Sequence, residues 1–107
     1  MTFDYYKTLI GEYINLGKSE EKLIAEIGYP EDITLSPDGF IKAISIIGSV
    51  VEHDIKRLVE LSGLSMRALS VKFAMPYRTL QDWCSGNRPA TEYIIMLIGY
   101  ALIGDIK

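Results

Sequence analysis

The 107-residue chain has very few of the residues that build disulfides, metal sites and catalytic centres. Its one cysteine, Cys84, cannot pair within the chain, so the fold must be held together by packing. Its one histidine, His53, and that single thiol supply too few soft ligands for a zinc site. We therefore expect neither a disulfide-rich secreted scaffold nor a bound metal. A lone thiol fits a reducing compartment, and we expect the protein to be cytoplasmic.

Patterns typical of enzymes and of membrane proteins are also missing. The sequence has no glycine-rich phosphate loop and no acid–base pair, so we expect no catalytic residue and no cofactor. No histidine lies near Cys84 in the sequence to activate it as a nucleophile. The apolar run Tyr93–Ile98 is much shorter than the ~20 residues that cross a bilayer. Residues 1–8 lack the basic start and the apolar run of a signal peptide.

The composition is that of a folded protein, with 49% hydrophobic and 23% charged residues. We expect one domain over 1–107, because two domains would each be near the size at which a core becomes marginal. The charge is divided along the chain. Residues 1–54 carry ten carboxylates and four lysines, a net charge of −6, whereas residues 55–107 carry seven basic and four acidic residues, a net charge of +3. This division is typical of a protein of which one half meets a polyanion, although scatter over two solvated surfaces is an alternative.

Apolar residues at helical spacing, together with capping residues, predict an all-α fold of about six helices. Two of these helices form an N-terminal extension over 1–35, which we expect to serve as an interface and to end in a loop over 30–35. Ser36-Pro37 begins the next helix, because serine is a good N-cap and proline is tolerated at the first helical position. The apolar stripe then continues as one helix over 37–62, or as two helices that break near Gly48-Ser49.

Three shorter helices are expected in the rest of the core region, which spans 36–107. They are predicted at about 66–73, 76–84 and 92–103. The first two are joined by a short turn, and Leu69, Leu80 and Trp83 are spaced to form a core that they share. Small residues, Ala68 and Ala74, are expected where these two helices approach each other. This arrangement leaves the exposed face of the second helix free to enter a DNA major groove.

Four short motifs follow one another in this region. They are Gly63-Leu64-Ser65, Ala74-Met75-Pro76, Thr79-Leu80 and Trp83-Cys84-Ser85-Gly86-Asn87-Arg88-Pro89. In this order, over about residues 54–104, they resemble the phage-repressor and Cro-like helix-turn-helix family, whose second helix ends in a Trp-x-x-Gly pattern. The resemblance implies that 36–107 is a helix-turn-helix core.

The resemblance also implies which residues contact DNA. Base contacts are expected from the second helix of the motif, at Tyr77, Arg78, Gln81 and Asp82. Phosphate contacts are expected at Ser65, Arg67, Lys72, Thr79, Asn87 and Arg88. Arg78 is suited to guanine and Gln81 to adenine. Two residues depart from the family pattern: Met66 stands where many members have glutamine, and Asp82 is a carboxylate that repels phosphate and can accept only from cytosine N4.

The sequence therefore predicts a homodimeric regulator, of phage or mobile-element origin, that represses a promoter by occupying double-stranded DNA. Two copies are expected because one helix makes few contacts, whereas a twofold pair reads half-sites about 34 Å apart. An alternative is a protein-interaction module, such as a phage-encoded, anti-CRISPR-type inhibitor whose acidic half fits the basic channel of a host nucleic-acid enzyme. An antitoxin that binds both a toxin and its own operator would combine the two roles.

Overall fold

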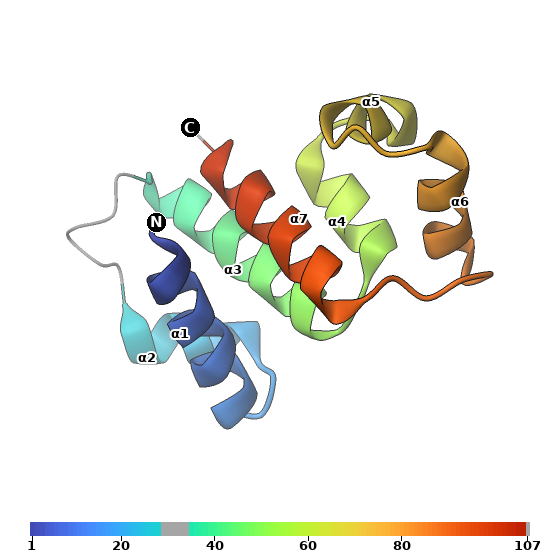
Figure 1. The fold of residues 1–107 in the computed structure, drawn as a ribbon. Coiled ribbons are helices and arrows are strands. Elements are labelled where there is room, and N and C mark those ends of the chain that lie inside the picture. The colour runs from blue at the N-terminus through green and yellow to red at the C-terminus, as the bar shows by residue number, and fades with distance from the viewer. Residues whose placement is uncertain (29–34, 107) are drawn as a thin grey trace.

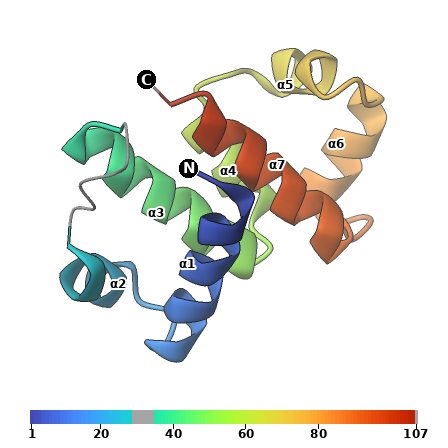
Figure 2. The same cartoon turned by 60° about the vertical axis from the view of Figure 1, so that its left-hand side comes forward.

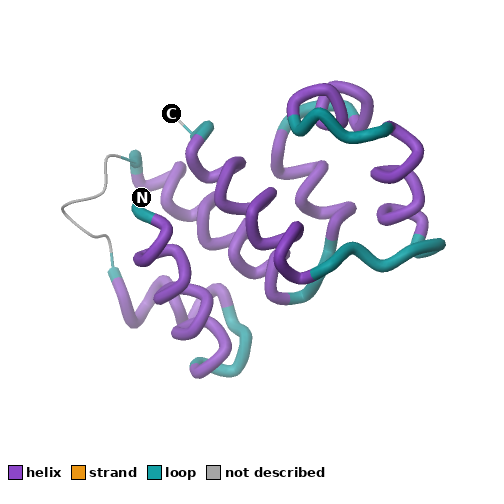
Figure 3. Tube along the Cα trace, viewed as in Figure 1, coloured by secondary structure: helices purple, strands orange, loops and turns teal. Residues whose placement is uncertain are grey.

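The computed structural model describes residues 1–28 and 35–106, and within them the chain forms seven α-helices and no strand (Figure 1). The helices are α1 (Phe3–Asn15), α2 (Glu20–Ile27), α3 (Pro37–Val51), α4 (Ile55–Ser62), α5 (Met66–Lys72), α6 (Tyr77–Ser85) and α7 (Glu92–Gly104). Figure 3 shows that the described segments between them are short loops. The prediction of an all-α fold is confirmed. The loop predicted over 30–35 lies, apart from Leu35, outside the described residues.

Serine and threonine side chains begin most of these helices, as the sequence predicted. In α2, α3, α5 and α7 the N-cap hydroxyl accepts a hydrogen bond from the backbone N–H three residues later, at 3.2, 3.0, 3.0 and 3.4 Å respectively. The start of α6 differs, because Pro76 precedes the first helical residue and no side chain caps the helix. Pro76 has an extended backbone (ψ 135°), so it directs the chain into α6 instead of forming its first residue.

The apolar stripe over 37–62 is divided into two helices, but the break lies later than Gly48-Ser49. Ser49 remains inside α3, where its hydroxyl donates to the Ser45 carbonyl at 2.9 Å. The chain turns at His53, whose φ is +55°, and Asp54 then caps α4 by accepting from the Arg57 N–H at 3.0 Å. Of the two predicted alternatives, the single helix over 37–62 is wrong, and the break near Gly48-Ser49 is misplaced by about one helical turn.

Gly48 has a packing role instead. A Cβ atom at this position would lie 2.8 Å from Glu20 Oε2 and 3.2 Å from the Tyr13 hydroxyl. The absence of a side chain lets α1 and α2 approach α3 closely. One of the two predicted alternatives placed a helix break near this glycine, because the contact that requires it is far away in the sequence.

Helix α3 lies at the centre of the molecule. It packs against α1, α2, α4 and α7, as two apolar faces on one helix require. The buried side chains of the seven helices and Leu35 form a single hydrophobic cluster. Figures 1 and 2 show α1 and α2 on one side of the molecule and α5 and α6 on the other.

A polar cluster joins α2 to α3 and α4. Arg57 of α4 donates two hydrogen bonds to the Glu20 carboxylate of α2, at 2.8 and 3.2 Å, and the Ser45 hydroxyl of α3 donates a third at 2.9 Å. Hydrogen bonding from Arg57, helped by Ser45, lowers the pKa of Glu20 even though burial acts in the opposite direction. The N-terminal extension is thus fixed to α4 through a charged contact as well as through apolar packing.

We expect a Glu20→Gln variant to be about 1 kcal/mol less stable than the wild type at pH 7, because both partners of the lost ion pair are partly solvated. A carboxylate whose pKa is lowered by folding stabilises the fold above its unfolded pKa of about 4.3, and this contribution is lost as the pH falls through the folded pKa. The difference between the two proteins should therefore shrink at pH 3. Urea denaturation at both pH values measures it.

The matched control is Glu21→Gln, which removes a neighbouring exposed charge from the same first turn of α2. It should change the stability much less at pH 7. A deficit for Glu20→Gln that is equal at pH 7 and pH 3 would contradict a role for the carboxylate charge.

Candidate nucleic-acid interface

Helices α5 and α6 form a helix-turn-helix at the side of the molecule away from α1 and α2 (Figure 1). In the turn, Ala74 adopts a φ of +52° and the Met75 N–H donates to the Ser70 carbonyl at 2.9 Å. Leu69 and Leu80 are 1% and 0% exposed, so they anchor the two helices as predicted. Trp83, the third predicted core residue, is only partly buried and packs at the edge of the core.

The expected positions of the two alanines are wrong. Both Ala68 and Ala74 are exposed and therefore do not lie where the helices approach each other. The small side chain of Ala74 instead suits the backbone, because a positive φ is most strained for bulky or β-branched residues.

One face of α6 lines an open groove. Arg78, Gln81, Asp82 and Ser85 share this face, since residues three and four positions apart are neighbours on a helix. The groove has a volume of about 500 Å³, and its other lining residues are Lys56, Met66, Cys84 and Asn87. Helix α6 packs against α4 and α5. The groove is therefore formed by the helix-turn-helix, the loop after α6 and the start of α4.

The four residues predicted to contact bases lie in different surroundings. Arg78 and Gln81 are exposed in the groove, whereas Asp82 lines the groove but is partly buried. Tyr77 is partly buried outside the groove lining, with the Arg67 guanidinium over its ring at 4.4 Å from the centroid. The groove thus brings together three of these residues and leaves the tyrosine to one side.

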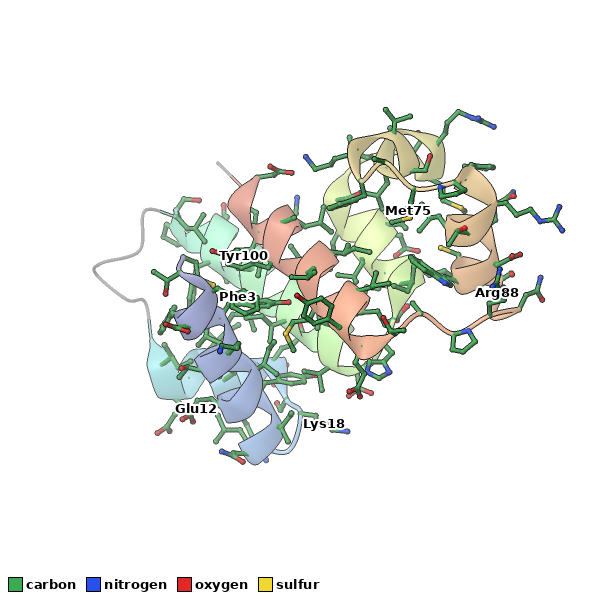
Figure 4. All side chains as sticks on the ribbon, in the orientation of Figure 1. Phe3, Glu12, Lys18, Met75, Arg88 and Tyr100 are labelled. Carbon is green, nitrogen blue, oxygen red and sulfur yellow. The ribbon has the colours of Figure 1, made fainter. Side chains whose placement is uncertain are left out.

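The residues predicted to contact phosphate are more scattered. Asn87 and Arg88 are exposed in the loop that follows α6, and Figure 4 shows Arg88 at the outer edge of the molecule. Arg67 is exposed on α5, and Thr79 is partly buried on α6. The Ser65 hydroxyl already accepts from the Ala68 N–H as a helix cap.

Two basic residues of the positive half are neutralised within the molecule. Lys72, which was expected at a phosphate, pairs with Asp105 beyond the end of α7 at 2.6 Å, and Arg57 pairs with Glu20. Among residues 1–28 and 35–106, no ion pair involves Lys56, Arg67, Arg78 or Arg88. These four unpaired basic residues lie on α4, α5, α6 and the loop after α6. Lys18, Lys22 and Lys42, which also make no ion pair among the described residues, lie elsewhere in the molecule.

Lys56 and Cys84 also line this groove, although neither was predicted to be a site residue. Lys56 belongs to α4, and no local pattern indicates that α4 packs beside α6. Burial raises the pKa of the Cys84 thiol, and nearby Lys56 only partly opposes this. The thiol is therefore protonated near neutral pH and is a poor nucleophile.

Comparison with known proteins adds no relative: no protein-family model, curated protein or solved structure matches this chain. Within the described part of the chain, no three histidine, cysteine, aspartate or glutamate side chains come together as a metal site would require. None of the described helices is long and apolar enough to cross a membrane.

Proposed function

We propose that this protein is a repressor-type transcriptional regulator whose α6 enters the major groove of DNA. The observation that carries the proposal is the exposed pair Arg78 and Gln81, three residues apart on one face of α6. An α-helix fits the major groove, where an arginine can donate two hydrogen bonds to guanine and a glutamine can exchange two with adenine. The unpaired basic residues around α6 supply attraction for the DNA backbone.

Other residues on and beside this face of α6 indicate which parts of the DNA they would contact. Asp82 is suited to accept a hydrogen bond from cytosine N4, and its charge disfavours a position beside phosphate. Asn87 and Arg88, in the exposed loop after α6, are placed to contact the backbone beside the groove. Because a single α6 offers few base-reading side chains, we propose that two copies bind together to neighbouring half-sites.

An Arg78→Ala variant should bind its selected DNA site about 5–150-fold more weakly, since the loss of a bidentate base contact costs about 1–3 kcal/mol. Fluorescence anisotropy with a labelled duplex recovered by random-site selection measures this change. The wild-type affinity should also fall steeply as the salt concentration rises.

Lys7→Ala is a matched control because it also removes one positive charge, but from α1 on the other side of the molecule. It should leave DNA affinity nearly unchanged. Micromolar or weaker binding of the wild type to every duplex in the selection would count against the proposal.

A second candidate is favoured by the acidic extension. Glu12, Glu21 and Glu26 are exposed on α1 and α2, where they could meet a basic protein surface. In this case the protein would act as an inhibitor of a nucleic-acid enzyme or as an antitoxin. A nuclease-resistant complex with a basic protein, combined with no binding to duplex DNA, would favour the inhibitor.

A further inference from the structure

The contact between Arg67 and Tyr77 joins the two helices of the helix-turn-helix. The guanidinium carbon of Arg67, on α5, lies 4.4 Å from the centroid of the Tyr77 ring, at the first residue of α6. Tyr77 is partly buried and Arg67 is exposed. The Arg67 guanidinium therefore lies over the tyrosine ring, on the solvent side of the contact.

A cation–π contact of this kind contributes little energy, but it restricts the positions that the arginine side chain can adopt. At an exposed site it contributes about 0.5–1 kcal/mol, much less than burial of the nearby core leucines. Ordering a free arginine side chain costs up to about 2 kcal/mol, so an arginine already held on a ring loses less freedom when it binds a ligand.

The stacked arginine keeps its hydrogen-bonding capacity. The guanidinium carbon lies over the ring, and the five N–H groups of an arginine radiate outward in the guanidinium plane. Among the ion pairs of the described residues, none involves Arg67. Its N–H groups are therefore available to a planar or tetrahedral anion such as a DNA phosphate.

The ring of Tyr77, and not its hydroxyl, makes this contact. No hydrogen bond to the hydroxyl is found within residues 1–28 and 35–106, and Tyr77 does not line the groove that holds Arg78 and Gln81. A side chain used to read a base would be expected in that groove.

We propose that Tyr77 is a positioning residue that holds the Arg67 guanidinium in place for a phosphate of the DNA backbone. The family resemblance implied that Tyr77 contacts a base. In this proposal Tyr77 instead supports a contact to the DNA backbone. This inference rests on the proposed DNA-binding function.

The test uses four full-length variants: Arg67→Ala, Tyr77→Phe, Tyr77→Leu, and the double variant of Arg67→Ala with Tyr77→Leu. Binding to a labelled mixed-sequence duplex of about 25 base pairs is followed by anisotropy over a series of salt concentrations. Thermal unfolding of each variant checks that the fold is intact.

Phenylalanine keeps the ring, so Tyr77→Phe should bind like the wild type with the same salt dependence. Tyr77→Leu should lose affinity about fivefold, like Arg67→Ala, and the slope of log K against log salt should fall by about one in each. The double variant should be no weaker than either single variant, because both changes remove the same phosphate contact. A purely structural role for the ring would lower the unfolding temperature without changing this slope.

Two outcomes would overturn the inference while leaving the proposed function intact. One is a Tyr77→Leu variant with wild-type affinity and slope alongside a weakened Arg67→Ala. The other is a Tyr77→Phe variant as weak as Tyr77→Leu, which would assign the contact to the hydroxyl. Absence of salt-dependent binding by the wild type would instead overturn both the proposed function and this inference.

Discussion

A Leu80→Ala variant is expected to lose about 2–5 kcal/mol of unfolding free energy. Leu80 is 0% exposed and is the buried residue of α6, which packs against α4 and α5. Alanine would leave a cavity beneath the helix that its neighbours can fill only in part. A nine-residue helix has little stability of its own, so α6 depends on this side chain. Urea denaturation at pH 7 measures the loss.

Gln81→Ala is the matched control, because it shortens the next side chain on the same helix at an exposed position. Its stability should stay within about 0.5 kcal/mol of the wild type. A Leu80→Ala variant that loses less than about 1 kcal/mol would mean that α6 is held mainly by other contacts.

A Gly99→Ala variant is expected to lose about 3 kcal/mol, at the upper end of the usual cost of overpacking a core. Gly99 is buried in α7, where a Cβ atom would overlap the Val50 side chain and lie 2.7 Å from the Tyr6 hydroxyl. Tyr6 cannot easily move aside, because it is 0% exposed and its hydroxyl donates to the Met96 carbonyl at 2.8 Å. Thermal or urea unfolding measures the loss.

Gly104→Ala tests the same substitution where there is space. Gly104 ends the same helix, and apart from its chain neighbours and the backbone of its own helix no described atom lies within 4 Å of the position that its Cβ would occupy. Alanine there should be neutral, or stabilising by up to about 1 kcal/mol, because it favours the helix more than glycine does. Equal losses for the two variants would show that the close approach at Gly99 does not determine the effect.

The helices could be predicted from the sequence wherever the deciding interactions are local. Caps such as Ser65 and Thr91 bond to the backbone three residues later, so their effect is visible in a short segment. The alternative of a break near Gly48-Ser49 misplaced the end of α3, because the glycine there is required by contacts with α1 and α2. The actual turn, at His53, depends on a left-handed backbone that no glycine or proline marks.

The candidate interface shows the same limit. The side-by-side placement of Arg78 and Gln81 follows from helical periodicity, and the structure has them on one face of α6. The ion pairs of Lys72 and Arg57 could not be predicted from helical periodicity, because their partners, Asp105 and Glu20, are distant along the chain. Local sequence therefore indicated which residues α6 presents, and tertiary packing decided which charges are left for a ligand.

The ion pair between Arg57 and Glu20 affects how charge is distributed over the molecule. It neutralises one positive charge on α4, while residues 1–54 carry a net charge of −6 and residues 55–107 a net charge of +3. The molecule is consequently an electric dipole. The field of a polyanion would rotate it during diffusion so that α6 arrives first, and added salt would remove this orientation before it removed the contacts themselves.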